Sequence, residues 1–289
     1  MNGSFNYTHR YVISSLCVIF AIFTLFIIFY HAFNRDLLTS AGVTISAGFA
    51  SVLSILVLYS GTKFHGVKVD KTQIFLVIGT WLWFGAELIF GYYQIWLITE
   101  APFPSLADPI YLAGYAFFTY YVFRALRILS QDIEREVLIL VSLAVAVSFG
   151  YIMNLSFGVA QLISVENETL AMVVSVSYPI LDGLLLVPAI VILWSAKKGD
   201  SSQTHWVMIS LFIVLNAVGD LGFGYSAYIG TLNEEMWLWD ILFIAGYLTL
   251  ISGLLWQIQY YFQNISTYHN RTNYIGASKE NKSNENSMN

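Results

Sequence analysis

The stretch Pro102-Phe-Pro-Ser-Leu-Ala-Asp-Pro-Ile-Tyr-Leu-Ala-Gly-Tyr115 decides the fold, because its core returns later in the chain as Asp240-Ile-Leu-Phe-Ile-Ala-Gly-Tyr247. The two cores are 132 residues apart. Upstream of them, Glu87-Leu-Ile-Phe-Gly-Tyr92 has a counterpart, Asp220-Leu-Gly-Phe-Gly-Tyr225, at an offset of 133 residues. A pattern that recurs at a nearly constant offset indicates a duplicated structural unit. The acidic residues and the Gly-Tyr pairs therefore occupy equivalent places in two halves of the chain.

The composition is that of a membrane protein. Hydrophobic residues make up 57% of the chain and charged residues only 11%, with a mean hydropathy of +0.66, whereas about a quarter of the residues in a soluble domain are charged. Apolar runs of about 20 residues can cross a bilayer. We therefore expect an all-α, polytopic membrane protein with eight transmembrane helices, near residues 11–32, 37–60, 72–98, 109–129, 136–158, 169–195, 204–230 and 239–262.

The repeat divides these helices into two sets of four. We expect residues 1–132 to form the first four-helix membrane repeat and residues 133–264 the second. Because each repeat has an even number of helices, the two repeats should be parallel and related by a pseudo-two-fold axis along the membrane normal. Residues 265–289 are rich in Asn, Ser and Lys without an apolar period, so we expect a disordered cytoplasmic tail.

Basic residues lie mostly at one end of the predicted helices. With a cytoplasmic N-terminus, all but one of the 13 Lys and Arg residues lie on the inner side, and only Arg35 lies outside. Such an excess is typical of cytoplasmic segments, so we expect a multi-pass protein of the cell membrane with both termini cytoplasmic. The same residues form no continuous basic surface, so we expect the lipid bilayer and not nucleic acid as a partner.

Three acidic residues, Glu87, Asp182 and Asp220, lie near the middle of predicted spans, where no basic residue is available to pair with them. A charge at the bilayer centre costs about 2.5–3.5 kcal/mol. We therefore expect these side chains to face the bundle interior, where they are protonated, hydrated, or balanced by a cation or a cationic small ligand. The alternative is that they are neutral and only hydrogen-bond to neighbouring helices.

Other polar residues extend this set. Asp108 and Asp240 are expected to be helix N-caps at the outer face, a role that requires no ligand. Tyr178 and Asn216 are expected to hydrogen-bond to the buried acids. No His or Cys spacing typical of a metal site occurs, and no cofactor or catalytic residue is indicated. The candidate ligand-binding residues are Glu87, Asp182, Asp220, Tyr178, Asn216, Asp108, Asp240, Tyr115 and Tyr247.

Three of these motifs resemble a known class of membrane region. They are the Pro-Ser-Leu-Ala-Asp-x-x-Tyr-Leu-x-Gly-Tyr run at 104–115, the Tyr178-Pro-x-x-Asp182 turn and the Asp240-x-x-x-x-x-Gly-Tyr247 run. The chain resembles the membrane-embedded N-terminal sensor regions of diguanylate cyclase (GGDEF)-type signalling proteins over most of residues 70–260, although no output domain follows. It has a weaker likeness, in architecture and acidic positions, to the YhhN-type lysoplasmalogenase-like family.

The first resemblance implies a sensor or ligand-binding membrane module with an acidic intramembrane cavity. Without an output domain, such a sensor would signal through a cytoplasmic partner, contacted by the connector Arg124 to Glu136 or by the tail. A proton- or cation-coupled small-molecule transporter is the alternative from the acids alone. The second resemblance implies a membrane lipid hydrolase that uses intramembrane carboxylates as acid and base.

Overall fold

The computed structural model is all-helical in the residues that it describes, which are 11, 13–22, 24–25, 35–63, 71–99, 101–129, 135–143, 145–147, 150, 168–195 and 203–287. Beyond Phe262 only the backbone is described. No strand occurs in these ranges. The elements are α2 (Arg35–Lys63), α3 (Gln73–Gly91), the π-helix η1 (Tyr92–Leu97), α4 (Ala107–Leu129), α6 (Glu168–Ser195), α7 (Thr204–Ile229) and α8 (Leu232–Ser287).

Five helices are long and apolar enough to cross a membrane: Leu37–Gly61, Gln73–Leu97, Thr169–Ser195, Thr204–Ala227 and Glu234–Phe262. Their outward side chains are apolar, as at Phe49 on α2 and Leu184 on α6, which is the pattern expected of helices that face lipid. α4 has 23 residues but is not among these five, because its Tyr and Arg side chains lower its mean hydropathy. The expected spans 11–32 and 136–158 lie partly outside the described residues, so the number of spans stays a prediction.

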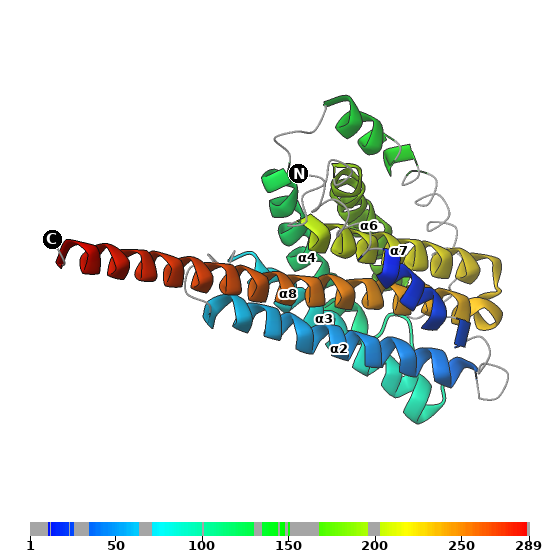
Figure 1. Ribbon diagram of the computed structural model, residues 1–289. Helices are drawn as coiled ribbons and strands as arrows, with labels where there is room; N and C mark the ends of the chain where they lie inside the picture. The colour runs from blue at the N-terminus through cyan, green and yellow to red at the C-terminus, as the bar shows by residue number, and fades with distance from the viewer. Residues whose placement is uncertain are drawn as a thin grey trace.

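α8 differs from its expected bounds at both ends. It begins at Leu232, before the expected residue 239. At this start the backbone N–H groups of Glu234 and Glu235 donate to the Thr231 carbonyl oxygen, at 3.0 and 3.1 Å. The helix then continues to Ser287 through the segment for which we expected a disordered tail. No proline interrupts the sequence after Phe262, so nothing in it sterically ends the helix. Figure 1 shows this part of α8 extending well beyond the other helices.

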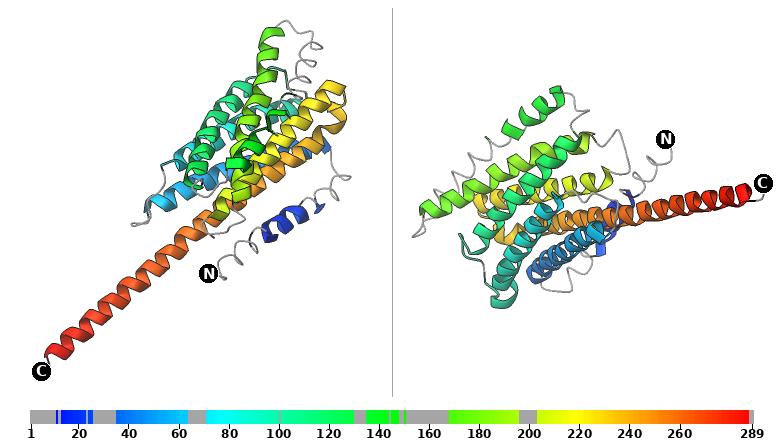
Figure 2. Two further views of the ribbon diagram at one scale, coloured as in Figure 1. Left: turned by 90° about the horizontal axis from the view of Figure 1, so that it is seen from above. Right: turned by 90° about the vertical axis from the view of Figure 1, so that its left-hand side faces the viewer.

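The helices form a bundle in which α7 packs on α8 and α3 packs on α4 (Figures 1 and 2). α2 contacts α3 and α8, while α6 contacts α7 and α4. In lipid, close approach of helices depends on small side chains and interhelical hydrogen bonds. On α2, Ser51 supplies both, because its small side chain is fully buried and its carbonyl oxygen accepts from Nε1 of Trp81 on α3 at 3.1 Å.

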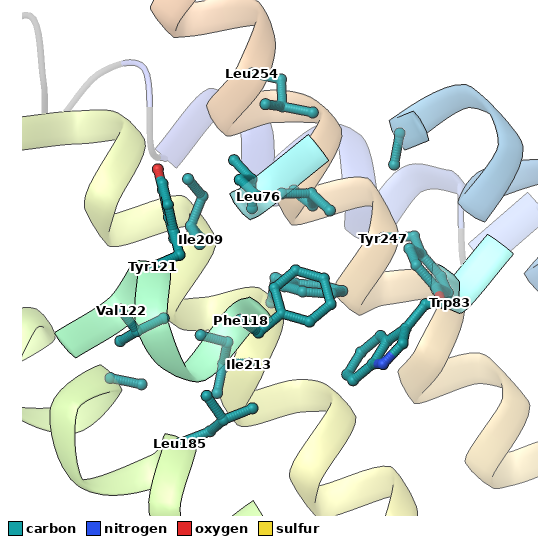
Figure 3. Close-up of a cluster of buried hydrophobic side chains, with 14 of the residues drawn as sticks. Leu76, Trp83, Phe118, Tyr121, Val122, Leu185, Ile209, Ile213, Tyr247 and Leu254 are labelled. Atoms are coloured by element: carbon teal, nitrogen blue, oxygen red, sulfur yellow. The ribbon is translucent and has the colours of Figure 1, made fainter. Parts of the chain in front are cut away.

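Buried hydrophobic side chains from α2, α3, α4, α6, α7 and α8 pack one half of the bundle, and Figure 3 shows part of this cluster. This half ends in an aromatic layer formed by Trp83, Phe118 and Phe212. The ring centroids lie 4.6 Å apart for Trp83 and Phe118, and 5.6 Å apart for Phe212 with either of them. The close spacing of these rings separates the packed half from the half that carries the polar residues.

Two glycines let the paired helices approach each other. A Cβ on Gly114 of α4 would overlap the Trp83 ring on α3, and a Cβ on Gly246 of α8 would overlap the Asn216 side chain on α7. Each Cβ would also lie 3.4 Å from a backbone carbonyl oxygen of the facing helix, that of Gly79 or of Phe212. Gly114 and Gly246 thus bring Tyr115 and Tyr247 against the neighbouring helix.

Candidate functional site

The polar half of the bundle encloses a cavity of about 650 Å³, a volume in the range of small-molecule sites. Its lining comes from α2, α3, η1, α4, α6, α7 and α8 and from the loop between η1 and α4. α2, α4, α6 and α8 begin at this end of the bundle, while α3 and α7 end there. Residues far apart in the sequence therefore meet around one space.

Carboxylates dominate the charge of this cavity. Among the described residues, five acidic side chains line it, and no Lys, Arg or His does. The acids come from α3, α4, α6, α7 and α8, so each of these helices contributes one. All nine candidate residues from the sequence lie in the lining: Glu87, Asp182, Asp220, Tyr178, Asn216, Asp108, Asp240, Tyr115 and Tyr247.

Tyr115 connects two of the acids. Its hydroxyl oxygen lies 2.7 Å from Oδ1 of Asp182 and 2.9 Å from Oδ2 of Asp220. A hydroxyl has one hydrogen to donate, so it can donate to only one of these carboxyl groups. The other must be protonated and donate to the tyrosine oxygen. Asp182 and Asp220 therefore hold at least one proton between them in this arrangement.

Glu87 has a tyrosine partner from the other half of the chain. The Tyr247 hydroxyl of α8 donates to Oε1 of Glu87 at 3.3 Å, and the Tyr111 hydroxyl also hydrogen-bonds to this carboxyl group. Glu87 is 9% exposed. The mid-depth acids on α3 and α7 are thus each held by a tyrosine from a Gly-Tyr pair.

The cap of α4 differs from the expected one. We expected Asp108 as the N-cap, but the Ser105 hydroxyl accepts from the Ala107 backbone N–H at 3.1 Å, while Asp108 Oδ2 accepts from the Ser105 backbone N–H at 2.5 Å. Ser105 and Asp108 form the reciprocal pattern of a capping box. The free carboxyl oxygen of Asp108 accepts from the Tyr178 hydroxyl at 2.9 Å. Tyr178 therefore bonds to Asp108 and not to Glu87, Asp182 or Asp220.

Asp240 is not a helix cap. Since α8 begins at Leu232, Asp240 lies two turns inside the helix, where it is 7% exposed and lines the cavity. Asn216 also differs from its expected role, because its Nδ2 donates to the Phe212 carbonyl oxygen at 2.8 Å. Helix periodicity predicts that both residues face the cavity, but it does not predict the hydrogen bond of Asn216.

Aromatic and other polar residues complete the walls. Trp83 lies at the boundary with the packed half, where its Nε1 donates to the Tyr111 carbonyl oxygen at 3.1 Å. Gln94 of η1 was not among our candidates, but it lines the cavity, accepts from the Ser40 hydroxyl and donates to the Met236 sulfur. The amide side chain of Gln94 within an otherwise apolar span is the sequence feature that could have identified it. No sequence pattern predicted that Met236 lines the cavity.

Within the described residues, no group of three or more His, Cys, Asp or Glu side chains is arranged to hold a metal ion. The acids lie on different walls and are joined by tyrosines, which suits protons, water or an organic ligand better than a compact coordination shell. The chain matches no known protein family, no curated protein and no solved structure.

Proposed function

We propose that the protein is an integral membrane sensor that binds a small cationic ligand in this cavity and signals through a cytoplasmic partner. One observation carries the proposal, namely that five carboxyl groups and no basic group line a single cavity. Buried acids without a basic partner require protons or a bound cation. A cationic ligand meets that requirement and has room in about 650 Å³.

The aromatic layer favours binding over passage through the bundle. Trp83, Phe118 and Phe212 lie between the cavity and the packed core. On the opposite side the lining includes the loop residues Ala101 to Phe103 and Gly230 at the turn between α7 and α8. A ligand that enters between these loops therefore meets a closed inner end, as a sensor of one compartment requires.

A parallel duplication accounts for how the cavity is built. The packing of α3 on α4 corresponds to that of α7 on α8, and the contact of α2 with α8 corresponds to that of α6 with α4. The hydrogen bond from Tyr115 to Asp220 likewise corresponds to that from Tyr247 to Glu87. These pairs support two parallel repeats in which each half donates a tyrosine to the acid of the other half.

The charge distribution supports a cytoplasmic output. If the basic loops face the cytoplasm, the cavity opens to the opposite side, and α8 runs from the cavity to the cytoplasmic end. Tyr247 places one residue of this helix at the acids, so a ligand that changes the Glu87 hydrogen bond can shift α8. A cytoplasmic signalling protein that contacts the extended end of α8 or the connector after α4 would detect that shift.

Ligand-dependent thermal stabilisation tests the proposal. We expect purified wild-type protein in lipid nanodiscs to be stabilised by some members of a panel of sodium, magnesium, calcium and small organic amines, by mass action. Glu87→Gln and Asp220→Asn should abolish or greatly reduce this stabilisation, because each removes a carboxylate from the cavity. The matched control is Glu234→Gln, which removes an exposed acid at the same end of the bundle.

Equal stabilisation of both variants and wild type would contradict a cation site in the cavity. Copurification of a cytoplasmic signalling protein, altered by the stabilising cation, is expected for a sensor. Turnover of extracted lipids by the purified protein would instead favour the lipid hydrolase that the second family resemblance implies.

A proton-coupled transporter is the second candidate, and the shared proton of Asp182 and Asp220 favours it. A carrier that exchanges a cation for a proton needs such a group on its transport route. Flux of a stabilising cation into liposomes, driven by a pH gradient, would establish this function. Cation binding without flux would contradict the transporter and support the sensor.

A further inference from the structure

The cavity has the dimensions and surface of a site for an organic cation. Ten lining residues are aromatic: Trp83, Phe90, Phe103, Tyr111, Tyr115, Tyr178, Phe223, Tyr225, Phe243 and Tyr247. Aromatic faces attract cations, most strongly when water is excluded. Carboxylates dispersed among such faces fit a cation with a carbon skeleton better than a bare metal ion, which requires several oxygens at one point.

Asp182 restricts the type of organic cation. The side chain is only 3% exposed and lines the cavity, and its Oδ1 accepts from Tyr115. Its Oδ2 is buried and has no hydrogen-bond partner among the described residues. A buried carboxyl oxygen without a donor is unfavourable, and a ligand N–H group would satisfy it. A quaternary ammonium ion has no N–H group and would leave Oδ2 unsatisfied.

No basic group compensates the acidic pair. The described helices around Asp182 and Asp220 present only phenols and carboxyl groups to them, and α2 presents no titratable group to the cavity. These groups are Tyr115 and Asp108 from α4, Tyr178 from α6, Glu87 from α3, and Tyr247 and Asp240 from α8. Loss of the shared proton is therefore favoured when another positive charge arrives.

We infer that the cavity binds a primary or secondary organic ammonium ion in exchange for the proton that Asp182 and Asp220 share through Tyr115. On binding, the Asp182 carboxyl group turns so that Oδ2 accepts from an N–H of the ammonium group. Both carboxyl groups are then ionised, and the Tyr115 hydroxyl donates to only one of them. The proton passes to water as one positive charge enters, so the net charge of the site does not change. This inference rests on the proposed function and specifies its ligand class and its coupling to pH.

Calorimetry on the full-length protein in nanodiscs tests the exchange with phenethylamine, its trimethylated quaternary analogue and phenethyl alcohol. We expect the amine to bind at least about 100-fold more tightly than the other two. One proton released per amine makes the affinity rise about tenfold per pH unit. The useful window is about pH 6 to 9, below the value near 10.4 at which an alkylammonium group loses its own proton. Titrations in buffers of different ionisation enthalpy count the released protons.

Asp182→Asn tests the residue while preserving its shape. We expect loss of at least about 100-fold in amine affinity and loss of the pH dependence, whereas Glu234→Gln should behave as wild type. A size-exclusion profile checks folding, and the wild-type ligand series decides the question if Asp182→Asn does not fold. Equal binding of the quaternary analogue, or amine binding that is independent of pH, would overturn the exchange but leave a cation-binding sensor. Failure of every cation to bind would remove both proposals.

Discussion

At the residue scale, the cavity depends on the arrangement of hydroxyl groups around its acids. Tyr115 is 1% exposed and contacts two carboxyl groups with one oxygen. Trp83 packs on its ring with a centroid separation of 5.1 Å, which limits the directions in which the hydroxyl can point. The position of the shared proton is therefore set by one well-packed side chain.

Tyr115→Phe should destabilise the protein by about 1–3 kcal/mol, because it leaves buried carboxyl oxygens without their partner while keeping the ring. Tyr120→Phe is the matched control on the same helix, since that side chain is half exposed and its ring, which packs on Phe75, is retained. Unfolding in mixed detergent micelles measures the difference. Similar stabilities of the two variants would show that the hydroxyl of Tyr115 contributes nothing.

At the scale of elements, glycines hold the helix pairs α3–α4 and α7–α8 close, and in each pair one of them, Gly114 or Gly246, precedes a tyrosine of the cavity. Gly114 and Gly246 face side chains that occupy the space of a Cβ. The tyrosine that follows each glycine reaches an acid only at this separation. The Gly-Tyr dipeptide is therefore a packing residue followed by a polar residue that depends on it.

Gly246→Ala should destabilise the α7–α8 pair by about 1–3 kcal/mol, since its methyl group would overlap Asn216. Gly85→Ala is the control, because a Cβ there meets nothing within 4 Å and alanine favours a helix over glycine by roughly 0.5–1 kcal/mol. Adding Asn216→Ala should recover part of the loss, which a double-mutant cycle would detect as coupling. Additive effects would exclude the overlap as the cause.

At the scale of the whole molecule, the proposed orientation places the cavity opening outside and the basic loops inside. Glu234 lies near the start of α8 at the cavity end, and Lys71 lies just before α3 at the opposite end. Both side chains are exposed. They therefore report on the two sides of the membrane without disturbing the interior.

In a Cys17→Ser background, a membrane-impermeant maleimide should label the Glu234→Cys variant in intact cells. It should label the Lys71→Cys variant only after permeabilisation, because the positive-inside bias places that loop in the cytoplasm. Gel-shift labelling before and after permeabilisation measures both. The reverse pattern would place the termini outside and the cavity opening on the cytoplasmic side.

The sequence alone determined the helical class, the apolar character of five long helices and the inward position of the acids. Hydropathy and helix period are local properties of the sequence. An ionisable side chain within a membrane span is favourable only when it faces the bundle interior. For this reason Glu87, Asp182 and Asp220 were recognisable without coordinates, as were the Gly-Tyr pairs that accompany them. The offset between motifs predicts a duplication, and both the duplication and its parallel arrangement stay a proposal.

Only the tertiary structure decided which groups touch. Asp182 meets Asp220 through Tyr115, although 105 residues separate Tyr115 from Asp220, and Gln94 joins the wall between Ser40 and Met236. Such partners depend on the rotation and separation of helices, which glycines and packed rings set across the whole bundle. Local patterns carry no information on these quantities, so the hydrogen bonds of Tyr178 and Asn216 emerged only when the helices were assembled.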